Sequence, residues 1–144
     1  MTLKVLIVDD HTNARLKIGR LLEGYDWVEV VGEAANGLEA IEQYVEHRPD
    51  LLFLDIQMPG LNGFEVVEKL QQMDHFPKVV FVTAFDEFAL KAFDVNAVDY
   101  LLKPVKKDRF AAAMGKLEAK LEPTPSTVVE YYRKHRKTKP QLLI

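Results

Sequence analysis

The sequence contains five short hydrophobic runs, and each one ends at a turn or at polar residues. The runs are residues 3–8, 28–31, 51–54, 79–82 and 98–102. Helical spacing of apolar residues fills the stretches between these runs and after the last one. Strands that alternate with helices predict an α/β fold with a parallel sheet and right-handed crossovers. We therefore expect a flavodoxin-like, doubly wound sheet of five strands in the order 2-1-3-4-5, with five helices.

Some of these runs would also suit buried helices, but their β-branched residues and flanking turn signals favour strands. Among the expected helices, the first has Asn13 as its candidate N-cap, and the last begins near Lys106. The apolar stripe of the last helix consists of Phe110, Met114, Leu117 and Leu121.

Polar side chains follow four of the five runs directly. Asp9 and Asp10 follow the first run, Asp55 the third, Thr83 the fourth and Lys103 the fifth. Because parallel strands bring their carboxyl ends to one edge of the sheet, we expect these side chains to converge on one cleft. Three carboxylates, a hydroxyl and an ammonium group suit a divalent metal ion together with a phosphoryl group.

The carboxylates indicate a magnesium site. Adjacent Asp9 and Asp10 repel each other, and a hard cation such as Mg²⁺, which takes oxygen ligands, would compensate their charges. Asp55 offers a further carboxylate, and the restricted turn after it would present the backbone carbonyl of Gln57 to the metal. A carboxylate beside bound Mg²⁺ can also attack phosphorus and form an acyl phosphate. The competing interpretation is that these aspartates only cap helices or stabilise turns.

Composition argues against several other functions. The chain of 144 residues has no cysteine, hence neither disulfides nor thiolate metal sites. It has no glycine-rich nucleotide-binding motif. No apolar run approaches the roughly 20 residues needed to span a bilayer, so we expect a cytoplasmic protein without membrane contact. The four histidines have no ligand spacing, and we expect His11, beside the acidic pair, to be exposed to solvent rather than bound to metal.

Charge divides the chain into two segments. Residues 1–122 contain 14 basic and 21 acidic residues, whereas residues 123–144 contain five basic residues and one acidic residue. The sequence Pro-Thr-Pro-Ser at 123–126 marks the boundary. We expect one domain at 1–122 and a linker or basic tail at 123–144 that leads to an output domain absent from this chain. The alternative is a tail that contacts nucleic acid phosphates.

The motifs VLIVDD, LDIQMPGLNG, FVTA and DYLLKP occur in this order within residues 3–121. Together they resemble the receiver domain of two-component response regulators. The resemblance implies that Asp55 accepts a phosphoryl group from the phosphohistidine of a sensor histidine kinase. It also implies that Asp10 binds Mg²⁺ directly, Asp9 largely through water, and Gln57 through its carbonyl.

By the same resemblance, Thr83 and Lys103 would contact the phosphoryl oxygens, and Tyr100 would be the switch aromatic. Such a domain catalyses only its own phosphotransfer and dephosphorylation, so it is not an enzyme in the ordinary sense. We also expect Phe85, together with Gln57, to influence the access of water to the acyl phosphate.

The segment FVTAFDEFALKAFDVNAVDYLLKPV is similar to receivers of LytTR-type (LytR/AlgR) regulators, whose output domain is a β-rich DNA-binding module. Residues 86–96 are expected to be helical, and Phe88, Leu90 and Phe93 cannot all face one core. We expect some of them to form an exposed dimerisation or output surface beside Tyr100. The alternative is a helix that its neighbours bury unusually well.

Two functions remain open. In the first, phosphorylation drives homodimerisation and so controls an attached DNA-binding domain that regulates transcription. In the second, a stand-alone receiver binds a protein partner without contacting DNA. A metal-dependent phosphohydrolase acting on other molecules is disfavoured, because neither a substrate pocket nor a separate general acid or base is evident.

Overall fold

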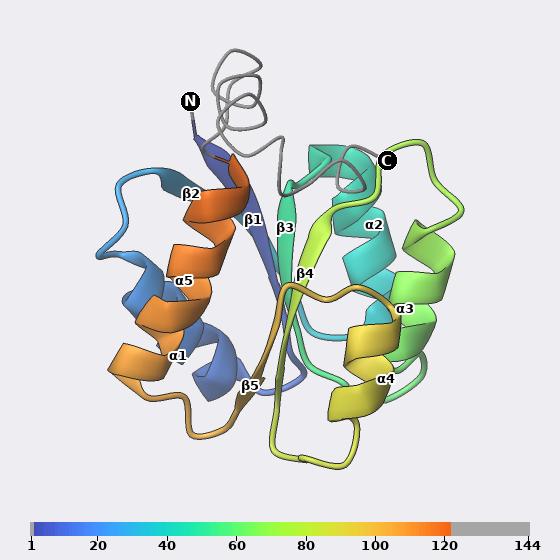
Figure 1. Ribbon diagram of the computed structural model, residues 1–144. Coiled ribbons are helices and arrows are strands. Elements are labelled where there is room, and N and C mark those ends of the chain that lie inside the picture. Colours follow the sequence, from blue (N-terminus) through green and yellow to red (C-terminus); the bar gives the residue numbers. More distant parts are fainter. Residues whose placement is uncertain (1, 122–144) are drawn as a thin grey trace, which may run out of the picture.

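The computed structural model describes residues 2–121 as five strands and five helices in strict alternation (Figure 1). The strands are β1 (Leu3–Val8), β2 (Val28–Ala34), β3 (Leu51–Leu54), β4 (Lys78–Thr83) and β5 (Asp99–Leu102). The helices are α1 (Thr12–Leu22), α2 (Gly37–His47), α3 (Gly63–Leu70), α4 (Ala89–Asp94) and α5 (Lys107–Leu121). All strand pairs are parallel and lie in the order β2-β1-β3-β4-β5. The predicted doubly wound sheet is therefore confirmed.

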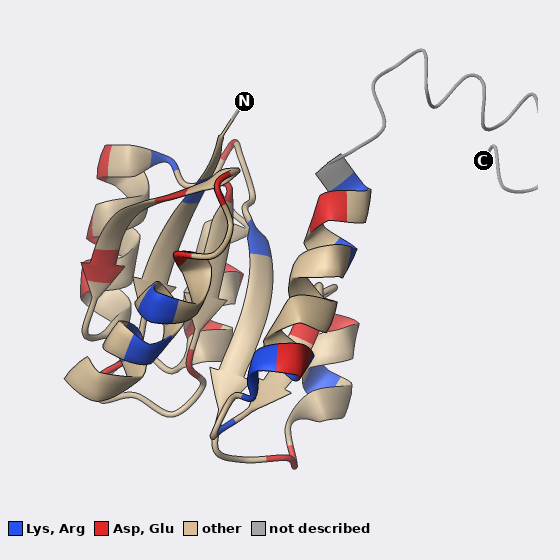
Figure 2. Ribbon diagram, turned by 90° about the vertical axis from the view of Figure 1, so that its left-hand side faces the viewer, with Lys and Arg blue, Asp and Glu red and all other residues tan. Residues whose placement is uncertain are grey.

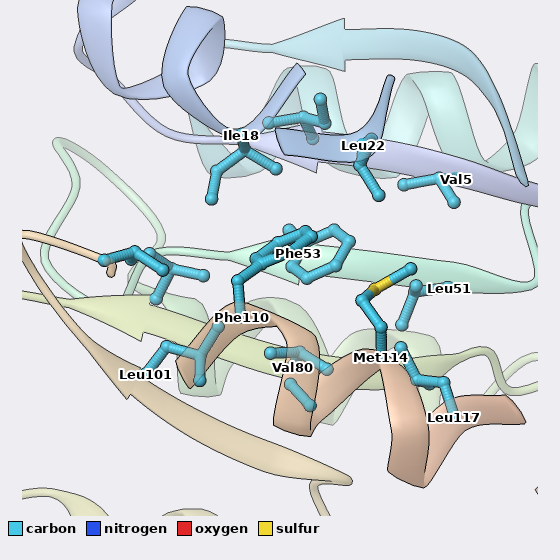
Figure 3. Close-up of a cluster of buried hydrophobic side chains, with 14 of the residues drawn as sticks. Val5, Ile18, Leu22, Leu51, Phe53, Val80, Leu101, Phe110, Met114 and Leu117 are labelled. Atoms are coloured by element: carbon cyan, nitrogen blue, oxygen red, sulfur yellow. The ribbon is translucent and has the colours of Figure 1, made fainter. Parts of the chain in front are cut away.

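Helices cover both faces of the sheet. Helices α1 and α5 pack on one face, and α2, α3 and α4 pack on the other (Figure 1). On the first face, the ring of Phe53 from β3 stacks on that of Phe110 from α5, with 5.5 Å between their centroids. Figure 3 shows Val5, Leu22 and Met114 around this pair.

The second face has its own core. Leu6, Leu54 and Phe81 from the central strands are fully buried there against Tyr44 of α2 and Val67 of α3. Because β1, β3 and β4 are covered on both sides, apolar residues occur consecutively rather than alternately along them. This is why their positions are readable from the sequence.

The first helix begins differently from the expectation. Asn13 is not its N-cap, because α1 begins at Thr12 with His11 in the capping position. The first turn closes through the backbone N–H of Arg15, which donates to the carbonyl of His11 over 3.2 Å. The carboxylate of Asp9 accepts the backbone N–H of His11 at 2.9 Å and so organises the turn before the helix.

The fourth helix is shorter than expected. It covers Ala89–Asp94 rather than residues 86–96, because residues 86–88 form a turn and Asn96 takes a left-handed backbone with φ of 63°. Asparagine tolerates this conformation better than most residues, which suits it to ending a helix.

The last helix begins at Lys107 and carries its predicted stripe. Phe110, Met114 and Leu117 are buried on it, while the side chain of Leu121 and residues 122–144 lie outside the described residues. Acidic and basic residues are interspersed along α5 (Figure 2). None of the helices described between residues 2 and 121 combines the length and apolar character that a bilayer crossing requires.

Candidate functional site

The polar residues predicted to converge do lie at one edge of the sheet. Val8 at the end of β1 pairs with Leu54 at the end of β3, so Asp9 and Asp55 leave neighbouring strands side by side. The backbone N–H of Asp55 donates to the carbonyl of Val8 at 3.0 Å, which continues the ladder beyond the strand. Both carboxylates are almost completely buried.

Lys103 joins these two carboxylates. It follows β5, and its Nζ lies 2.8 Å from Asp9 Oδ2 and 3.1 Å from Asp55 Oδ2. The peptide bond between Lys103 and Pro104 is cis. Three residues that are far apart in the sequence therefore form one charged cluster.

This cluster has more negative than positive charge. Burial and the neighbouring charge of Asp9 raise the pKa of Asp55, although Lys103 acts against them. Burial alone would lower the pKa of Lys103, but its hydrogen bonds to Asp9 and Asp55 and their charges raise it above its ordinary value. Lys103 therefore keeps its positive charge, while the charged form of Asp55 carries an electrostatic penalty that a further cation would relieve.

Asp10 supplies a further carboxylate at this edge. Its Oδ1 is buried and has no hydrogen bond among the described residues. The imidazole Nδ1 of His11 lies 3.2 Å from this oxygen, but without the geometry of a hydrogen bond. A buried polar atom in this condition is rare, and an ion at the site would explain it.

The arrangement fits a divalent cation. Asp9, Asp10, His11 and Asp55 each offer one ligand atom, and these atoms lie within 4.8 Å of one another. Carboxylate oxygens are the ligands that Mg²⁺ prefers. Gln57 is exposed in the loop after Asp55, and the role of its carbonyl as a ligand stays a prediction.

Helix α3 packs closely against the loop that carries Asp55. The backbone N–H of Gly63 donates to the carbonyl of Ile56 at 2.8 Å. A Cβ atom at position 63 would come within 2.5 Å of the Asp55 carbonyl oxygen and 3.0 Å of the Ile56 Cα. Only glycine allows this approach, so the start of α3 fixes the main chain at Asp55.

Thr83 ends β4 and is fully buried. Its hydroxyl accepts a hydrogen bond of 3.3 Å from the backbone N–H of Phe85, and its carbonyl accepts one of 2.8 Å from the backbone N–H of Lys103. The threonine thus connects the loop after β4 with the end of β5. Contact between its hydroxyl and a phosphoryl group stays a prediction.

Tyr100 lies on β5 beside that loop and is half-buried. Its hydroxyl donates to the backbone carbonyl of Phe85, and its ring lies 6.4 Å from that of Phe81. Burial raises the pKa of Tyr100, so the phenol remains protonated at neutral pH and able to donate. The tyrosine is therefore attached to the segment that leads into α4.

Helix α4 exposes two of the apolar residues that the sequence analysis selected. Leu90 is 82% exposed and Phe93 is 79% exposed, whereas Ala92 is buried. Phe88 is only partly exposed, and its ring packs 6.0 Å from that of Phe64. The exposure of Leu90 and Phe93 contradicts the alternative of a helix that its neighbours bury unusually well.

Two arginines beside the charged residues were not predicted from the sequence. Arg15 of α1 donates to the backbone carbonyl of Asp9 at 2.7 Å and pairs with Glu33 of β2 at 2.9 Å. It therefore holds the main chain at Asp9 against α1 and β2. Arg109 of α5 donates to both carboxylate oxygens of buried Asp99, at 2.9 and 2.7 Å. A charged residue at the start of an otherwise apolar strand was the available signal for the second pair.

The sequence pattern of the response regulator receiver domain matches residues 5–115. The chain is 51% identical over 115 residues to the transcriptional regulatory protein BtsR of Salmonella typhi, covering 80% of this chain and 48% of that protein. It is 46% identical over 114 residues to the sensory transduction protein LytT of Bacillus cereus, covering 79% and 46%. The chain thus spans about half the length of these curated relatives.

Solved structures agree with this match. The response regulatory domain of mrkE from Klebsiella pneumoniae superimposes with a TM-score of 0.77 at 34% identity, covering 83% of this chain and 98% of that one. The REC domain of AraT from Geobacillus stearothermophilus gives a TM-score of 0.74 at 36% identity, covering 85% and 97%.

Proposed function

This chain belongs to the response regulator receiver family, and from that premise we propose that Asp55 accepts a phosphoryl group from a sensor histidine kinase with Mg²⁺. The receiver sequence is most like those of LytTR-type regulators. One observation carries the proposal. Lys103 contacts Asp9 and Asp55 together, beside an Asp10 oxygen that has no hydrogen bond within the described part of the chain.

Asp10, Asp9 and Asp55 would hold the Mg²⁺ ion, with the Gln57 carbonyl as a further ligand. Bound there, Mg²⁺ supplies positive charge to phosphoryl oxygens and offsets the repulsion among the carboxylates. An oxygen of Asp55 forms the new bond to phosphorus while the bond between phosphorus and the kinase imidazole breaks. Lys103 and Thr83 stabilise the charge on the transferring group, so catalysis is mainly positioning and electrostatics.

The same residues link the site to the switch. The hydroxyl of Thr83 now accepts a hydrogen bond from the backbone N–H of Phe85. A phosphoryl group on Asp55 would offer this hydroxyl a new acceptor and so draw it away from Phe85. The Phe85 carbonyl is also the acceptor for Tyr100, so movement of this loop releases the tyrosine hydroxyl. The change is a shift in population, limited by the extra contacts that the phosphoryl group makes in one state.

The output surface would consist of Leu90 and Phe93, with Phe88 and Tyr100 beside them. Two large apolar side chains exposed three residues apart on one helix suit a contact with a second copy of the chain. Phosphorylation would thereby promote a homodimer. It would act on transcription through a DNA-binding output domain beyond residues 1–122, with 123–144 as the linker or basic tail.

Phosphorylation is tested with a small phosphodonor such as acetyl phosphate. Wild-type protein should acquire a Mg²⁺-dependent label, and Asp55→Asn should acquire none. Asp74→Asn, which removes an exposed carboxylate elsewhere, is the matched control and should label normally. A Mg²⁺-dependent label that persists in the Asp55→Asn protein would contradict the assignment.

The output surface is tested by size-exclusion chromatography with and without Mg²⁺ and beryllofluoride, a phosphoryl mimic. The mimic should shift wild-type protein to a dimer, while the double variant Leu90→Ser, Phe93→Ser remains a monomer. Leu38→Ser, which removes an exposed leucine from α2, should dimerise like the wild type. A double variant that still dimerises would mean that a different interface joins the two copies. It would also favour the alternative function, a stand-alone receiver that binds another protein.

A further inference from the structure

His11 lies at the mouth of the acidic cluster. It follows Asp10 and precedes α1, and its side chain is 72% exposed, as the sequence analysis expected. Its Nδ1 nevertheless lies 3.2 Å from Asp10 Oδ1 and 3.5 Å from Asp9 Oδ1. Exposure therefore does not separate this imidazole from the carboxylates.

These distances suit neighbouring ligands of a single ion. In an octahedral site with metal–ligand distances of about 2.1 Å, adjacent ligand atoms are about 3 Å apart and opposite ones about 4.2 Å apart. The donor atoms of Asp9, Asp10, His11 and Asp55 all lie within 4.8 Å of one another, so small side-chain adjustments satisfy this geometry. The unpartnered oxygen of Asp10 is an independent indication that a ligand belongs there.

We propose that His11 is a nitrogen ligand that makes this site prefer late first-row divalent cations, such as Ni²⁺, more strongly than carboxylates alone would. Imidazole suits these metals, whereas Mg²⁺ takes oxygen ligands and keeps several waters. Since His11 is exposed, it can turn towards solvent when Mg²⁺ binds. The proposal depends on the metal site of the proposed function and adds metal selectivity to it.

His11 can be replaced without disturbing the fold. Its side chain makes no capping hydrogen bond to α1. The contact that organises the turn comes from its backbone N–H, which an alanine retains. The variant His11→Ala therefore isolates the imidazole from the helix start.

The experiment is calorimetric titration of tag-free protein with Ni²⁺ and with Mg²⁺, including titration of Ni²⁺ into Mg²⁺-saturated protein. Competition between the two ions identifies binding at the shared site rather than at other histidines. His11→Ala should weaken the competitive Ni²⁺ binding by about tenfold or more, since the loss of residues that merely orient ligands already costs about 10–100-fold. Mg²⁺ affinity should change less than twofold.

The control is His75→Ala, which removes an exposed imidazole far along the chain from the cluster and should leave both affinities unchanged. A second readout is the paramagnetic shift of the His11 ring signals by Ni²⁺, which Asp10→Asn should abolish.

Three outcomes overturn the proposal while leaving the magnesium site intact. They are unchanged Ni²⁺ affinity in His11→Ala, an equal loss of both affinities, and Ni²⁺ binding that Mg²⁺ does not displace. Failure of wild-type protein to bind either ion would instead contradict the proposed function itself.

Discussion

Two charged clusters lie near the strand ends, and their charge balance is opposite. At the first, the ammonium group of Lys103 contacts Asp9 and Asp55, while Asp10 lies beside them with an oxygen that has no hydrogen bond among residues 2–121. At the second, the lone carboxylate of Asp99 is surrounded by cations. One is Arg109, and the other is an ammonium group from the next turns of α5, Lys116, at 3.2 Å.

The electrostatic consequence differs accordingly. The pKa of Asp55 is raised by burial and by the charge of Asp9. Burial also acts to raise the pKa of Asp99, but hydrogen bonds from Arg109, the Tyr100 N–H and Lys116 overcome it and lower that pKa. One cluster is incomplete without a further cation, and the other needs nothing more. The incomplete cluster is therefore the one suited to bind and react, while the satisfied cluster attaches α5 to β5.

The largest expected effect is a loss of phosphorylation rate when the incomplete cluster loses Lys103. Lys103→Met removes the ammonium group that contacts both Asp9 and Asp55 and should slow phosphorylation by acetyl phosphate about 100-fold, the effect of deleting one group that stabilises transition-state charge. The measurement is the initial rate of labelling. Lys106→Met, at a nearby exposed lysine, should label at the wild-type rate. An unchanged rate in Lys103→Met would mean that the ammonium group does not assist the transfer.

A substitution in the satisfied cluster should change the stability of the fold instead of the rate of phosphorylation. Asp99→Asn replaces a charged acceptor with a neutral one and should lower the free energy of unfolding by about 2 kcal/mol, the size of a hydrogen bond to a charged group. Urea denaturation monitored by circular dichroism measures this. Asp94→Asn, at the exposed end of α4, is the control and should have little effect. Equal stability of Asp99→Asn and wild type would show that the ion pair is dispensable.

The contribution of Asp99 should also depend on pH. Its pKa is lowered by folding, so its stabilisation is fully present above the unfolded-state pKa of about 3.9 and declines as the pH falls through the folded-state pKa. The difference in unfolding free energy between wild type and Asp99→Asn should therefore be constant from pH 7 to pH 5 and shrink below pH 4. A difference that grows on acidification would have the wrong sign for this pair.

The smallest change in stability is expected at the phosphoacceptor position, and its sign is opposite to that at Asp99. Asp55→Asn removes a charge that its surroundings disfavour, so it should slightly raise the free energy of unfolding of metal-free protein. The measurement is urea denaturation in the presence of a chelator. A destabilised variant would show that Lys103 compensates the charge of Asp55 fully.

The incomplete cluster was predictable, because its members occupy equivalent places in the chain. Asp9, Asp55 and Lys103 each follow a buried strand, and parallel pairing places such residues together whatever the details of the loops. The satisfied cluster was not predictable in the same way. Whether Arg109 reaches Asp99 depends on how α5 is oriented against β5, and no short-range pattern encodes that orientation.

The ends of two helices were also not predictable from the sequence. Asn13 is a good capping residue by type, but the main chain already turns at His11 through its bond to Asp9. At α4, the helix begins only at Ala89, after a turn that its apolar sequence does not indicate. In both cases contacts outside the helix decide where it begins.

Gly63 has a consequence for how variation in this domain would be interpreted. It carries no functional group, yet a methyl group at this position would collide with the main chain of Asp55. A screen of random substitutions scored only by signalling would therefore rank Gly63 beside the aspartates and the lysine. Such a screen would measure how accurately the phosphoacceptor is held as well as which residues react, and only a separate assay of folding would distinguish the two.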